Sequence, residues 1–263
     1  MKKYLVIGNP IEHSLSPIIH NFWFKAHKEE AIYEKKKVEE NELKGLVSEI
    51  KNENISGMNI TVPFKNSIIK HLDKLSEISE KTQSVNTVYK YKNKLYGHNT
   101  DSVGFGLSLE QTKFKTNGKI AFILGAGGVT SSIIYALKSK GVSEIFVTNR
   151  TKAKAENLKK MFSEIKILEW GQRPLKFDII INTTSLGLKE TDKIEINFSD
   201  CKDKLFFDLI YSNKTKFLKD RESSNYTKDG MSMFVFQAQM AYESWFGYKP
   251  NLENKLWELL SNQ

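Results

Sequence analysis

The strongest constraint on the fold is the alternation of strand patterns with helix patterns along almost the whole chain. Short apolar segments such as KKYLVIG at residues 2–8 are followed by segments of helical period, such as residues 41–52. No internal repeat, low-complexity tract or Pro/Gly/Ser-rich linker interrupts the alternation. This arrangement is typical of α/β proteins that pack helices against mostly parallel sheets.

The first part of the chain predicts a substantial α/β unit. Ser16-Pro17 reads as a helix start, with serine as the cap and proline at the first helical position. We expect strands at residues 2–8, 31–38 and 55–63, helices at 16–28, 41–52, 65–72 and 75–82, and a hairpin over 86–98 that turns at Lys92-Asn93.

The strand–helix pattern restarts after Asn117-Gly118, so we place a domain break near residue 102. A chain of 263 residues is long enough to form two domains of ordinary size. In the second part we expect strands at residues 119–124, 143–150, 177–185 and 204–211, helices at 129–141, 153–162 and 231–245, and a short helix near the end. The strands at 177–185 and 204–211 are continuously apolar, as burial on both faces of a sheet requires.

Charge and hydropathy exclude several classes of function. The net charge is +9, from 40 basic and 31 acidic residues, but the lysines are scattered among acids and no aromatic-interleaved basic motif occurs. We therefore expect a lysine-rich solvated surface and no nucleic-acid partner. No apolar run approaches the length that a bilayer requires, so we expect no membrane partner.

Cysteine and histidine usage narrows the remaining chemistry. The single cysteine, Cys201, rules out an internal disulfide, and the apolar part of the N-terminal segment is too short for a secretion signal. A cytoplasmic location is therefore expected. We expect no metal site, because no ligand pairing at helical or turn spacing links the five histidines, His13, His20, His27, His71 and His98.

A glycine loop indicates a dinucleotide site in the second domain. The segment ILGAGGVTSS places Gly125, Gly127 and Gly128 directly after a strand and before a helix. Glycines there allow a tight turn and let backbone N–H groups and the helix N-terminus approach a pyrophosphate. The usual third glycine would fall at Thr130, so the pattern is incomplete, and a purely structural turn is the alternative.

The end of the next strand favours NADP(H) over NAD. The strand ends in VTNRTKAK, with Arg150 where an acidic residue would grip the ribose hydroxyls of NAD. An acid would repel a 2′-phosphate, whereas an arginine with a neighbouring hydroxyl would bind one. An ordinary surface arginine is the alternative.

Polar side chains gather where the first-domain strands are expected to end. Ligands of open α/β sheets lie outside the carboxyl ends of the strands. The residues at those ends are Ser14, Ser16, Asn59, Thr61, Lys65, Asn86, Asn99 and Asp101. This mixture of hydroxyls, amides, one cation and one anion suits a small, polyhydroxylated, anionic ligand.

Nine segments of the chain resemble the shikimate dehydrogenase family in order and spacing. They are GNPIEHSLSPIIHN, GMNITVPFK, VNTV, GHNTD, LGAGG, NRT, NTTSLGL, DLIY and GMSMFVFQA. The resemblance extends from Gly8 to about Gly247. It implies the reduction of 3-dehydroshikimate to shikimate with NADPH, in the aromatic amino-acid pathway.

The resemblance also assigns roles to residues at matching positions. It implies that Lys65 and Asp101 are the catalytic pair. It implies a set of substrate ligands, Ser14, Ser16, Thr61, Asn86 and Gln237, with Asn59 and Tyr211 close by. It implies an NADP site formed by Gly125, Ala126, Gly127, Gly128, Val129, Asn149, Arg150 and Thr151, with Thr183, Ile210 and Gly230 on its nicotinamide half.

The domain organisation that follows from the resemblance is discontinuous. Members of the family return their last helices to the first domain. We therefore expect a substrate domain of residues 1–102 plus 237–263, a Rossmann-like NADP domain of residues 103–236, and a cleft between them. The chain departs from the family's usual residues at Gln83-Ser84, Val129 and Asn213.

The chemistry of the expected pair has two readings. Reducing a ketone needs a hydride at carbon, which a nicotinamide supplies, and a proton at oxygen. Lys65 could donate that proton or act as a fixed cation that stabilises the developing alkoxide. Asp101 would orient the lysine through a charge-assisted hydrogen bond in either case.

Two alternative functions remain open on the sequence. One is a quinate/shikimate dehydrogenase that uses NAD as well as NADP, against which Arg150 argues. The other is a non-catalytic NADP-binding regulator on the same fold, against which the presence of both Lys65 and Asp101 argues. The expected partner is a small-molecule substrate, and the chain could be a monomer or a homodimer.

Overall fold

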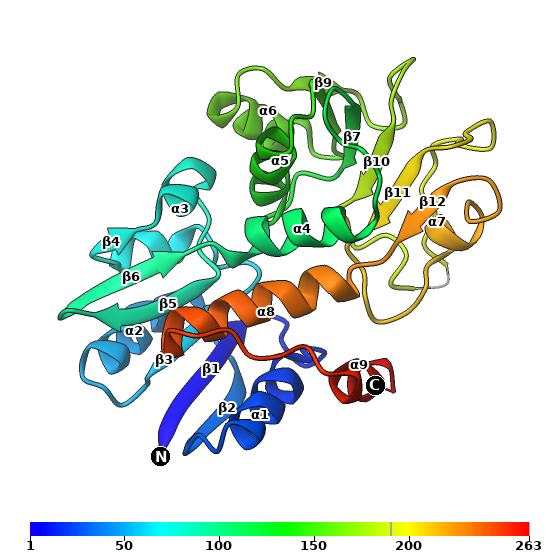
Figure 1. Ribbon diagram of the computed structural model, residues 1–263. Coiled ribbons are helices and arrows are strands. Elements are labelled where there is room, and N and C mark those ends of the chain that lie inside the picture. The colour runs from blue at the N-terminus through cyan, green and yellow to red at the C-terminus, as the bar shows by residue number, and fades with distance from the viewer. Residues whose placement is uncertain (190, 263) are drawn as a thin grey trace. The chain divides into compact units, whose positions relative to one another are not determined.

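The computed structural model describes residues 1–189 and 191–262. Positions 190 and 263, which fall inside the two expected domains, lie outside the described residues. The chain divides into two compact units: unit 1 comprises Met1–Val103 and Val235–Gln263, and unit 2 comprises Gly104–Phe234. Each contains a sheet covered by helices, so the α/β fold class is confirmed (Figure 1).

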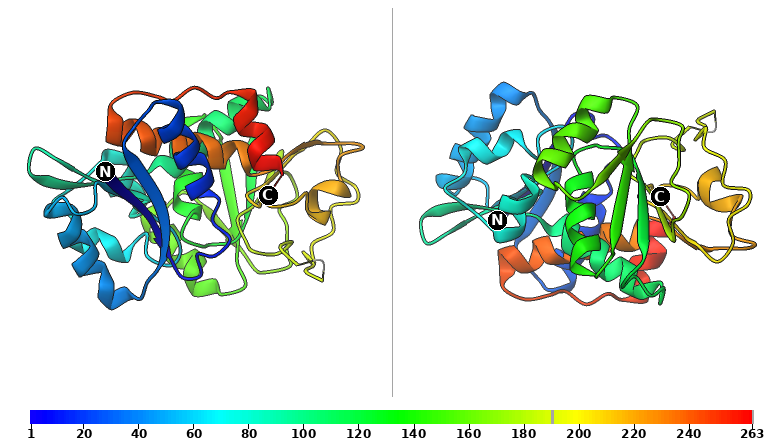
Figure 2. Two further views of the ribbon diagram at one scale, coloured as in Figure 1. Left: turned by 90° about the horizontal axis from the view of Figure 1, so that it is seen from below. Right: turned by 90° about the horizontal axis from the view of Figure 1, so that it is seen from above.

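The sheet of unit 1 combines parallel and antiparallel pairs in the order β2-β1-β3-β5-β6-β4. Its strands are β1 (Lys2–Gly8), β2 (Ala31–Lys37), β3 (Gly57–Ile60), β4 (Lys74–Leu75), β5 (Thr87–Tyr91) and β6 (Lys94–His98). The helices of this unit include α1 (Ser16–Ala26), α2 (Leu43–Lys51), α3 (Glu77–Thr82) and α9 (Asn254–Ser261). Figure 2 shows the C-terminal α9 beside α1, near the other end of the chain.

The topology of this sheet gathers several strand ends at one edge. β1 and β3 are parallel, so their carboxyl ends lie at the same edge. β5 is antiparallel to β3, and Thr87 at its start lies opposite Asn59 of β3. β6 is antiparallel to β5, so it ends at that edge too, with His98 opposite Thr87. Residues that follow β1, β3 and β6, or precede β5, therefore meet there.

The two faces of β3 pack against different layers. Met58 and Ile60 join the aliphatic core that includes residues of β1 and α2. Gly57 lies on the opposite face, where a Cβ atom would come within 2.5 Å of Trp245 Nε1. Trp245 belongs to α8 (Met231–Phe246), so the absence of a side chain at Gly57 lets this helix approach the strand closely.

Some elements of unit 1 differ from those predicted. A 3₁₀ turn at Ser67–His71 replaces the helix expected at residues 65–72, and Leu75 belongs to a short strand before α3. Ser16 is the first residue of α1 and not its cap. The preceding serine contributes instead, because Ser14 Oγ accepts a hydrogen bond from the Ser16 backbone N–H at 3.3 Å.

Helix α4 (Thr100–Gln111) was not expected from the sequence. Its interior contains Gly104 and Gly106, and each glycine disfavours a helix by about 1 kcal/mol relative to alanine. Phe105 and Leu109 on this helix are fully buried in the core of unit 2. Tertiary packing therefore supports a helix that local propensity does not predict.

The sheet of unit 2 is parallel in every pair that the structure describes, with the order β12-β11-β10-β7-β8-β9. Its strands are β7 (Ile120–Leu124), β8 (Glu144–Thr148), β9 (Lys166–Leu168), β10 (Ile179–Asn182), β11 (Leu205–Asp208) and β12 (Tyr226–Lys228). Its helices include α5 (Thr130–Ser139), α6 (Lys152–Met161) and α7 (Lys216–Lys219). The chain passes from β7 to β8 on one side and later to β10 on the other, which makes the end of β7 a topological switch point.

The continuous apolar strands of unit 2 are buried on both faces, as predicted. Ile179 and Ile181 of β10 lie in one core cluster and Ile180 lies in another. Helix α6 packs against β8 and β9 at one end of this sheet (Figure 1). Among the described residues, none of the helices has the length and apolar character needed to cross a membrane.

An aromatic layer covers the second face of the unit 1 sheet, and His20 lies inside it. The imidazole is fully buried and stacks on Tyr33 at 4.4 Å with an interplanar angle of 10°. It also contacts Trp23, Phe24 and Trp245. Neither ring nitrogen has a hydrogen-bond partner among the described residues, and burial lowers the pKa of His20 to about 3.

We predict that replacing His20 by phenylalanine makes unfolding less sensitive to acid. The unfolded histidine binds a proton near its ordinary pKa of 6.5, whereas the folded one stays neutral to about 3. Its contribution to stability is therefore complete above pH 6.5 and is lost as pH falls below that value. Between about pH 7 and about pH 5 the wild type should lose ~2 kcal/mol more than His20→Phe.

The free energy of unfolding is measured by urea denaturation across that pH range. The slopes of this free energy against pH are compared between the two proteins, because a packing effect that is equal at every pH cancels in the slopes. His13→Gln, at an exposed position, is the control. Parallel pH profiles for wild type and His20→Phe would contradict the prediction.

Candidate active site

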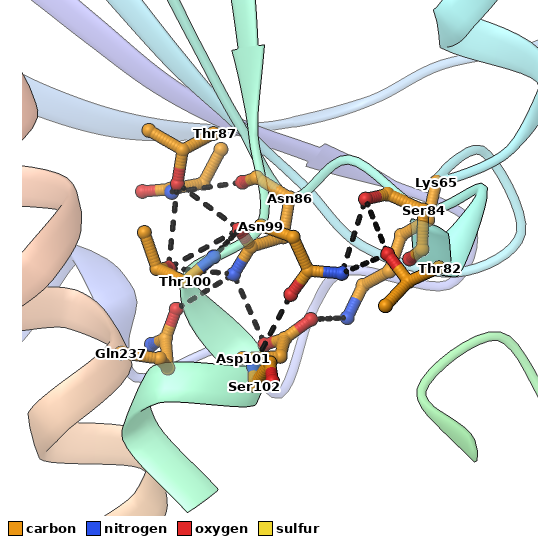
Figure 3. Close-up of polar contacts among 11 residues, drawn as sticks. Lys65, Thr82, Ser84, Asn86, Thr87, Asn99, Thr100, Asp101, Ser102 and Gln237 are labelled. Atoms are coloured by element: carbon orange, nitrogen blue, oxygen red, sulfur yellow. Dashed lines mark hydrogen bonds and ion pairs between the residues drawn. The ribbon is translucent and has the colours of Figure 1, made fainter. Parts of the chain in front are cut away.

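Lys65 and Asp101 lie in contact at the carboxyl edge of the unit 1 sheet. Lys65 Nζ is 2.6 Å from Asp101 Oδ2 (Figure 3). The lysine follows β3, and the aspartate lies in the first turn of α4. Their side chains are only 11% and 8% exposed, so this pair is much drier than an ordinary surface ion pair. The structure thus brings together the two residues expected to form the catalytic pair.

The start of α4 fixes the aspartate. Asn99 Oδ1 accepts a hydrogen bond from the Ser102 backbone N–H at 3.2 Å, which is the geometry of a helix cap. The Asn99 amide in turn donates to Thr82 Oγ1 and to the Ser84 carbonyl, both at 3.0 Å. The positive end of a helix favours a carboxylate in its first turn. Asp101 is therefore held by a capped, buried helix start.

Asn86 connects the aspartate to the C-terminal part of the chain. Its Oδ1 accepts from the Thr100 backbone N–H at 2.8 Å, so its Nδ2 must face the other way. That amide nitrogen donates to Asp101 Oδ1 at 3.0 Å and to Gln237 Oε1 at 3.3 Å (Figure 3). Gln237 lies on α8, so two expected substrate ligands that are 151 residues apart in sequence meet here.

The other expected ligands of unit 1 differ in accessibility. Ser14 and Thr61 are partly exposed, whereas Ser16 is buried. Asn59 is also buried, and its Nδ2 donates to the Asn86 carbonyl at 2.9 Å and to Thr87 Oγ1 at 3.0 Å. The Asn59 amide therefore braces Asn86 and the start of β5.

The chemistry available at this edge is that of binding and protonating a small polar molecule. Lys65 carries three N–H donors, so its bond to Asp101 leaves donors able to reach a ligand oxygen. Asn86, Gln237, Ser14 and Thr61 offer further amide and hydroxyl groups. No group of three or more His, Cys, Asp or Glu side chains within residues 1–189 and 191–262 has the arrangement of a metal site.

The glycine loop of unit 2 follows β7 and leads into α5. Gly125 has a φ of +109°, and a Cβ atom there would lie 2.6 Å from Thr183 Oγ1. Gly127 and Gly128 are exposed, and a Cβ on either would meet no atom within 4 Å. Bare backbone therefore borders open space just before the helix N-terminus, as close approach to a pyrophosphate requires. Val129 immediately precedes α5.

The end of β8 lies beside this loop. Asn149 Oδ1 accepts from the Ala126 backbone N–H at 3.0 Å, and Asn149 Nδ2 donates to the Thr151 carbonyl at 2.8 Å. Arg150 and Thr151 are exposed between these anchors. An exposed guanidinium and a hydroxyl beside the glycine loop suit a 2′-phosphate. The residues present therefore fit NADP(H).

The residues expected near the nicotinamide follow β10 and β11. Thr183 Oγ1 donates to the Leu124 carbonyl at 2.9 Å and lies 3.0 Å from Thr130 Oγ1. Ile210 is buried, and its carbonyl accepts from the Gly230 N–H at 3.1 Å. Position 230 admits only glycine, because a Cβ atom would lie 2.1 Å from the Leu209 carbonyl oxygen.

Tyr211 follows Ile210 in the same unit. Its ring stacks on Phe234 with centroids 4.7 Å apart, and burial raises the pKa of its phenol. It belongs to unit 2, whereas the other expected substrate ligands belong to unit 1.

Several supporting residues were not identified from the sequence. Thr87 and Thr100 hydrogen-bond Asn86, and their only signal was their place inside the motifs VNTV and GHNTD. Asp208 ends β11 and accepts hydrogen bonds from Thr215 Oγ1 at 2.6 Å and the Ile210 N–H at 3.1 Å. Burial raises the pKa of Asp208 to about 6. A single acid within the apolar run FFDLI was the available signal.

Two separate family models match residues of the two units. A family model described as the shikimate dehydrogenase substrate binding domain matches residues 6–88. A second, described as shikimate / quinate 5-dehydrogenase, matches residues 108–210. Over 262 residues the chain is 51% identical to the shikimate dehydrogenase (NADP(+)) of Pelagibacter ubique, covering 98% of each chain. The chain belongs to the shikimate dehydrogenase family.

Solved structures of shikimate dehydrogenases have the same fold. The crystal structure of the Aquifex aeolicus enzyme matches with a TM-score of 0.90 and 34% identity, covering 100% of this chain and 98% of that one. The Thermus thermophilus enzyme in complex with NADP(H) and shikimate matches with a TM-score of 0.88 and 28% identity, covering 100% and 99%. The family identified from the sequence motifs is thereby confirmed.

Proposed function

We propose that this protein catalyses the reversible NADPH-dependent reduction of 3-dehydroshikimate to shikimate, in the pathway to chorismate and the aromatic amino acids. The observation that carries the proposal is the dry Lys65–Asp101 pair at the sheet edge of a chain that belongs to the shikimate dehydrogenase family. The named relatives support both the substrate and the cofactor.

The substrate is held by unit 1 residues at the edge where β1, β3 and β6 end. Ser14, Ser16 and Thr61 offer hydroxyls, and Asn86 and Gln237 offer amides, to the carboxylate and hydroxyl groups of the substrate. Asn59 acts close by as a brace for Asn86, which its hydrogen bonds support. Tyr211 completes the proposed ligand set from unit 2.

The catalytic pair supplies the polar half of the reaction. Lys65 holds the oxygen of the reacting carbonyl and supports its conversion to a hydroxyl, as the proton donor or as a fixed cation. Asp101 accepts a charge-assisted hydrogen bond from the ammonium and keeps it aimed at that edge. Asn86 occupies the second oxygen of the carboxylate, so Asp101 cannot rotate freely.

Unit 2 would hold the cofactor. Gly125 to Val129 and the N-terminus of α5 would take the pyrophosphate, and Asn149, Arg150 and Thr151 would take the adenosine 2′-phosphate. Thr183, Ile210 and Gly230 would border the nicotinamide. Bound NADP(H) supplies the hydride chemistry. The units 1–102 plus 237–263 and 103–236 are accordingly proposed as substrate domain and NADP domain.

The second candidate function is the oxidation of quinate as well as shikimate. It is favoured by the description of the family model that matches residues 108–210, which names both substrates. Use of NAD belongs to this alternative, and the exposed Arg150 argues against it. A non-catalytic NADP-binding regulator is disfavoured by the intact Lys65–Asp101 contact.

The deciding experiment is a spectrophotometric assay of the purified protein. We expect reduction of NADP on addition of shikimate and weaker turnover on quinate. Turnover with NAD should be at least about tenfold less efficient, since NAD lacks the 2′-phosphate and loses a charge-assisted contact. Equal efficiency on quinate would establish the second candidate. Binding of NADP without any hydride transfer would support the regulator instead.

We also propose a cytoplasmic location, and a monomer or a homodimer as the assembly. Cys201 is a buried free thiol, which suits a reducing cytoplasm. Size-exclusion chromatography with light scattering distinguishes a monomer from a homodimer.

A further inference from the structure

Tyr33 of β2 has a buried hydroxyl that the proposed reaction does not use. The side chain is 2% exposed, and its ring is packed against His20. Its hydroxyl donates to Asn59 Oδ1 at 2.7 Å. β2 and β3 are not neighbours in the sheet, because β1 lies between them. The phenol therefore reaches across one strand to a residue at the substrate edge.

Burial raises the pKa of the Tyr33 phenol, and the Ser16 side chain of α1 opposes that rise. Ser16 and Asn59 come from different elements, a helix and a strand, and each is buried at the substrate edge. The hydrogen bond to Asn59 is the contact that links the Tyr33 hydroxyl to the site.

The contact with Tyr33 decides which way the Asn59 amide faces. A tyrosine hydroxyl that donates to Oδ1 leaves Nδ2 on the opposite side. There it donates to the Asn86 carbonyl and to Thr87 Oγ1, and Thr87 Oγ1 lies 3.2 Å from Asn86 Oδ1. Asn86 holds Asp101. A continuous set of buried hydrogen bonds therefore runs from Tyr33 to the carboxylate that orients Lys65.

We propose that Tyr33 is a positioning residue of the substrate site, which fixes the Asn59–Asn86 pair through one buried hydroxyl. This inference rests on the proposed function. Removing the hydroxyl takes from the buried Asn59 Oδ1 the donor that holds it. This change loosens the Asn59–Asn86 pair at the substrate edge, whereas the cofactor residues of unit 2 keep their own contacts.

The test is Tyr33→Phe, which keeps the ring stacked on His20. We expect the KM for shikimate to rise about tenfold, because a lost buried hydrogen bond with an orphaned partner weakens binding by about that factor. The KM for NADP should not change, and kcat should fall by less than the KM rises.

The matched control is Tyr242→Phe. Tyr242 is equally buried in unit 1, and its hydroxyl contacts His27 Nδ1 at 2.8 Å and Tyr248 at 3.1 Å, away from the substrate edge. It should lower the melting temperature by a similar amount and leave the shikimate KM unchanged. A second test combines Tyr33→Phe with Asn59→Ser: if Tyr33 acts through Asn59, the double variant is little worse than Asn59→Ser alone.

The possible results distinguish a failure of the role of Tyr33 from a failure of the proposed function. An unchanged shikimate KM in Tyr33→Phe, an equal rise in Tyr242→Phe, or fully multiplicative effects in the double variant would overturn the inference. If the wild-type protein oxidises shikimate with NADP, any of these results defeats only the role of Tyr33. If the wild type does not oxidise shikimate, the proposed function fails first and the inference fails with it.

Discussion

Replacing Lys65 by alanine should lower kcat for shikimate oxidation by at least about 10²-fold, the lower range for loss of a general acid–base or oxyanion-type group. Lys65 is the cation at the sheet edge that pairs with Asp101, and its side chain is largely shielded from water. Water cannot substitute efficiently for a donor held in such a place. The KM for NADP should stay near the wild-type value, because the cofactor residues lie in unit 2.

The variant leaves the Asp101 carboxylate without its ammonium partner, so a folding control is needed. Lys65→Gln keeps a hydrogen-bond donor near the aspartate and should lose activity to a similar degree while melting closer to the wild type. Lys90→Ala is the matched lysine: Lys90 pairs with Glu53 at 2.7 Å on the same sheet, and its loss should leave kcat unchanged. Near-full turnover by folded Lys65→Ala would remove the lysine from the mechanism.

Replacing Arg150 by alanine should raise the KM for NADP by about tenfold to hundredfold, as expected for loss of a charge-assisted contact with a phosphate. The guanidinium is exposed beside the glycine loop, at the position that would meet the 2′-phosphate. NAD lacks that phosphate, so its KM should not change. The preference for NADP over NAD should therefore fall by the same factor.

The control for this variant is Arg221→Ala, which removes an arginine that donates to the Asp220 carbonyl at 2.9 Å elsewhere in unit 2. It should leave both cofactors unaffected. Steady-state kinetics with each cofactor at saturating shikimate measure the effect. A cofactor preference that survives Arg150→Ala would show that the exposed arginine has no part in selecting NADP.

The strands of unit 2 were predictable because burial on both faces of a sheet requires an uninterrupted run of apolar residues. Ile179 to Ile181 have no polar position, and the structure buries all three. β3 was harder, since apolar Met58 and Ile60 alternate with polar Asn59 and Thr61, a pattern typical of a strand with one buried face. Met58 and Ile60 do enter the aliphatic core, but Asn59 between them is buried too, with its amide fully engaged. Polar residues that are satisfied inside a fold look like surface residues in a sequence.

Helix α4 could not be predicted from local propensity. Glycines at 104 and 106 argue against a helix, and what supports it is the capping by Asn99 together with the burial of Phe105. This matters for the site, because Asp101 owes its position to that helix start. The sequence placed Asp101 at the correct edge of the sheet without indicating what fixes it there.

The residues that surround the substrate edge were recognised unevenly. Lys65 and Asp101 follow from strand ends and from the family motifs, and their contact is present. Gln237 came from the resemblance alone, because no spacing rule relates it to Asn86 at a separation of 151 residues. Tyr33 was not recognised at all, since its role depends on reaching across β1, which only the order of strands reveals.

Unit 1 combines segments that precede and follow unit 2 in the chain, and this fixes the order in which its parts are synthesised. Tyr4 and Phe24 are made before unit 2, whereas the rings that pack against them, Trp245 and Phe246, are made after it. The N-terminal sheet must therefore wait with an uncovered aromatic face while all of unit 2 is translated, and such surfaces are prone to association. A chain whose synthesis stops before α8 would therefore lack the rings that cover one face of its N-terminal sheet, and unit 1 would remain incompletely folded.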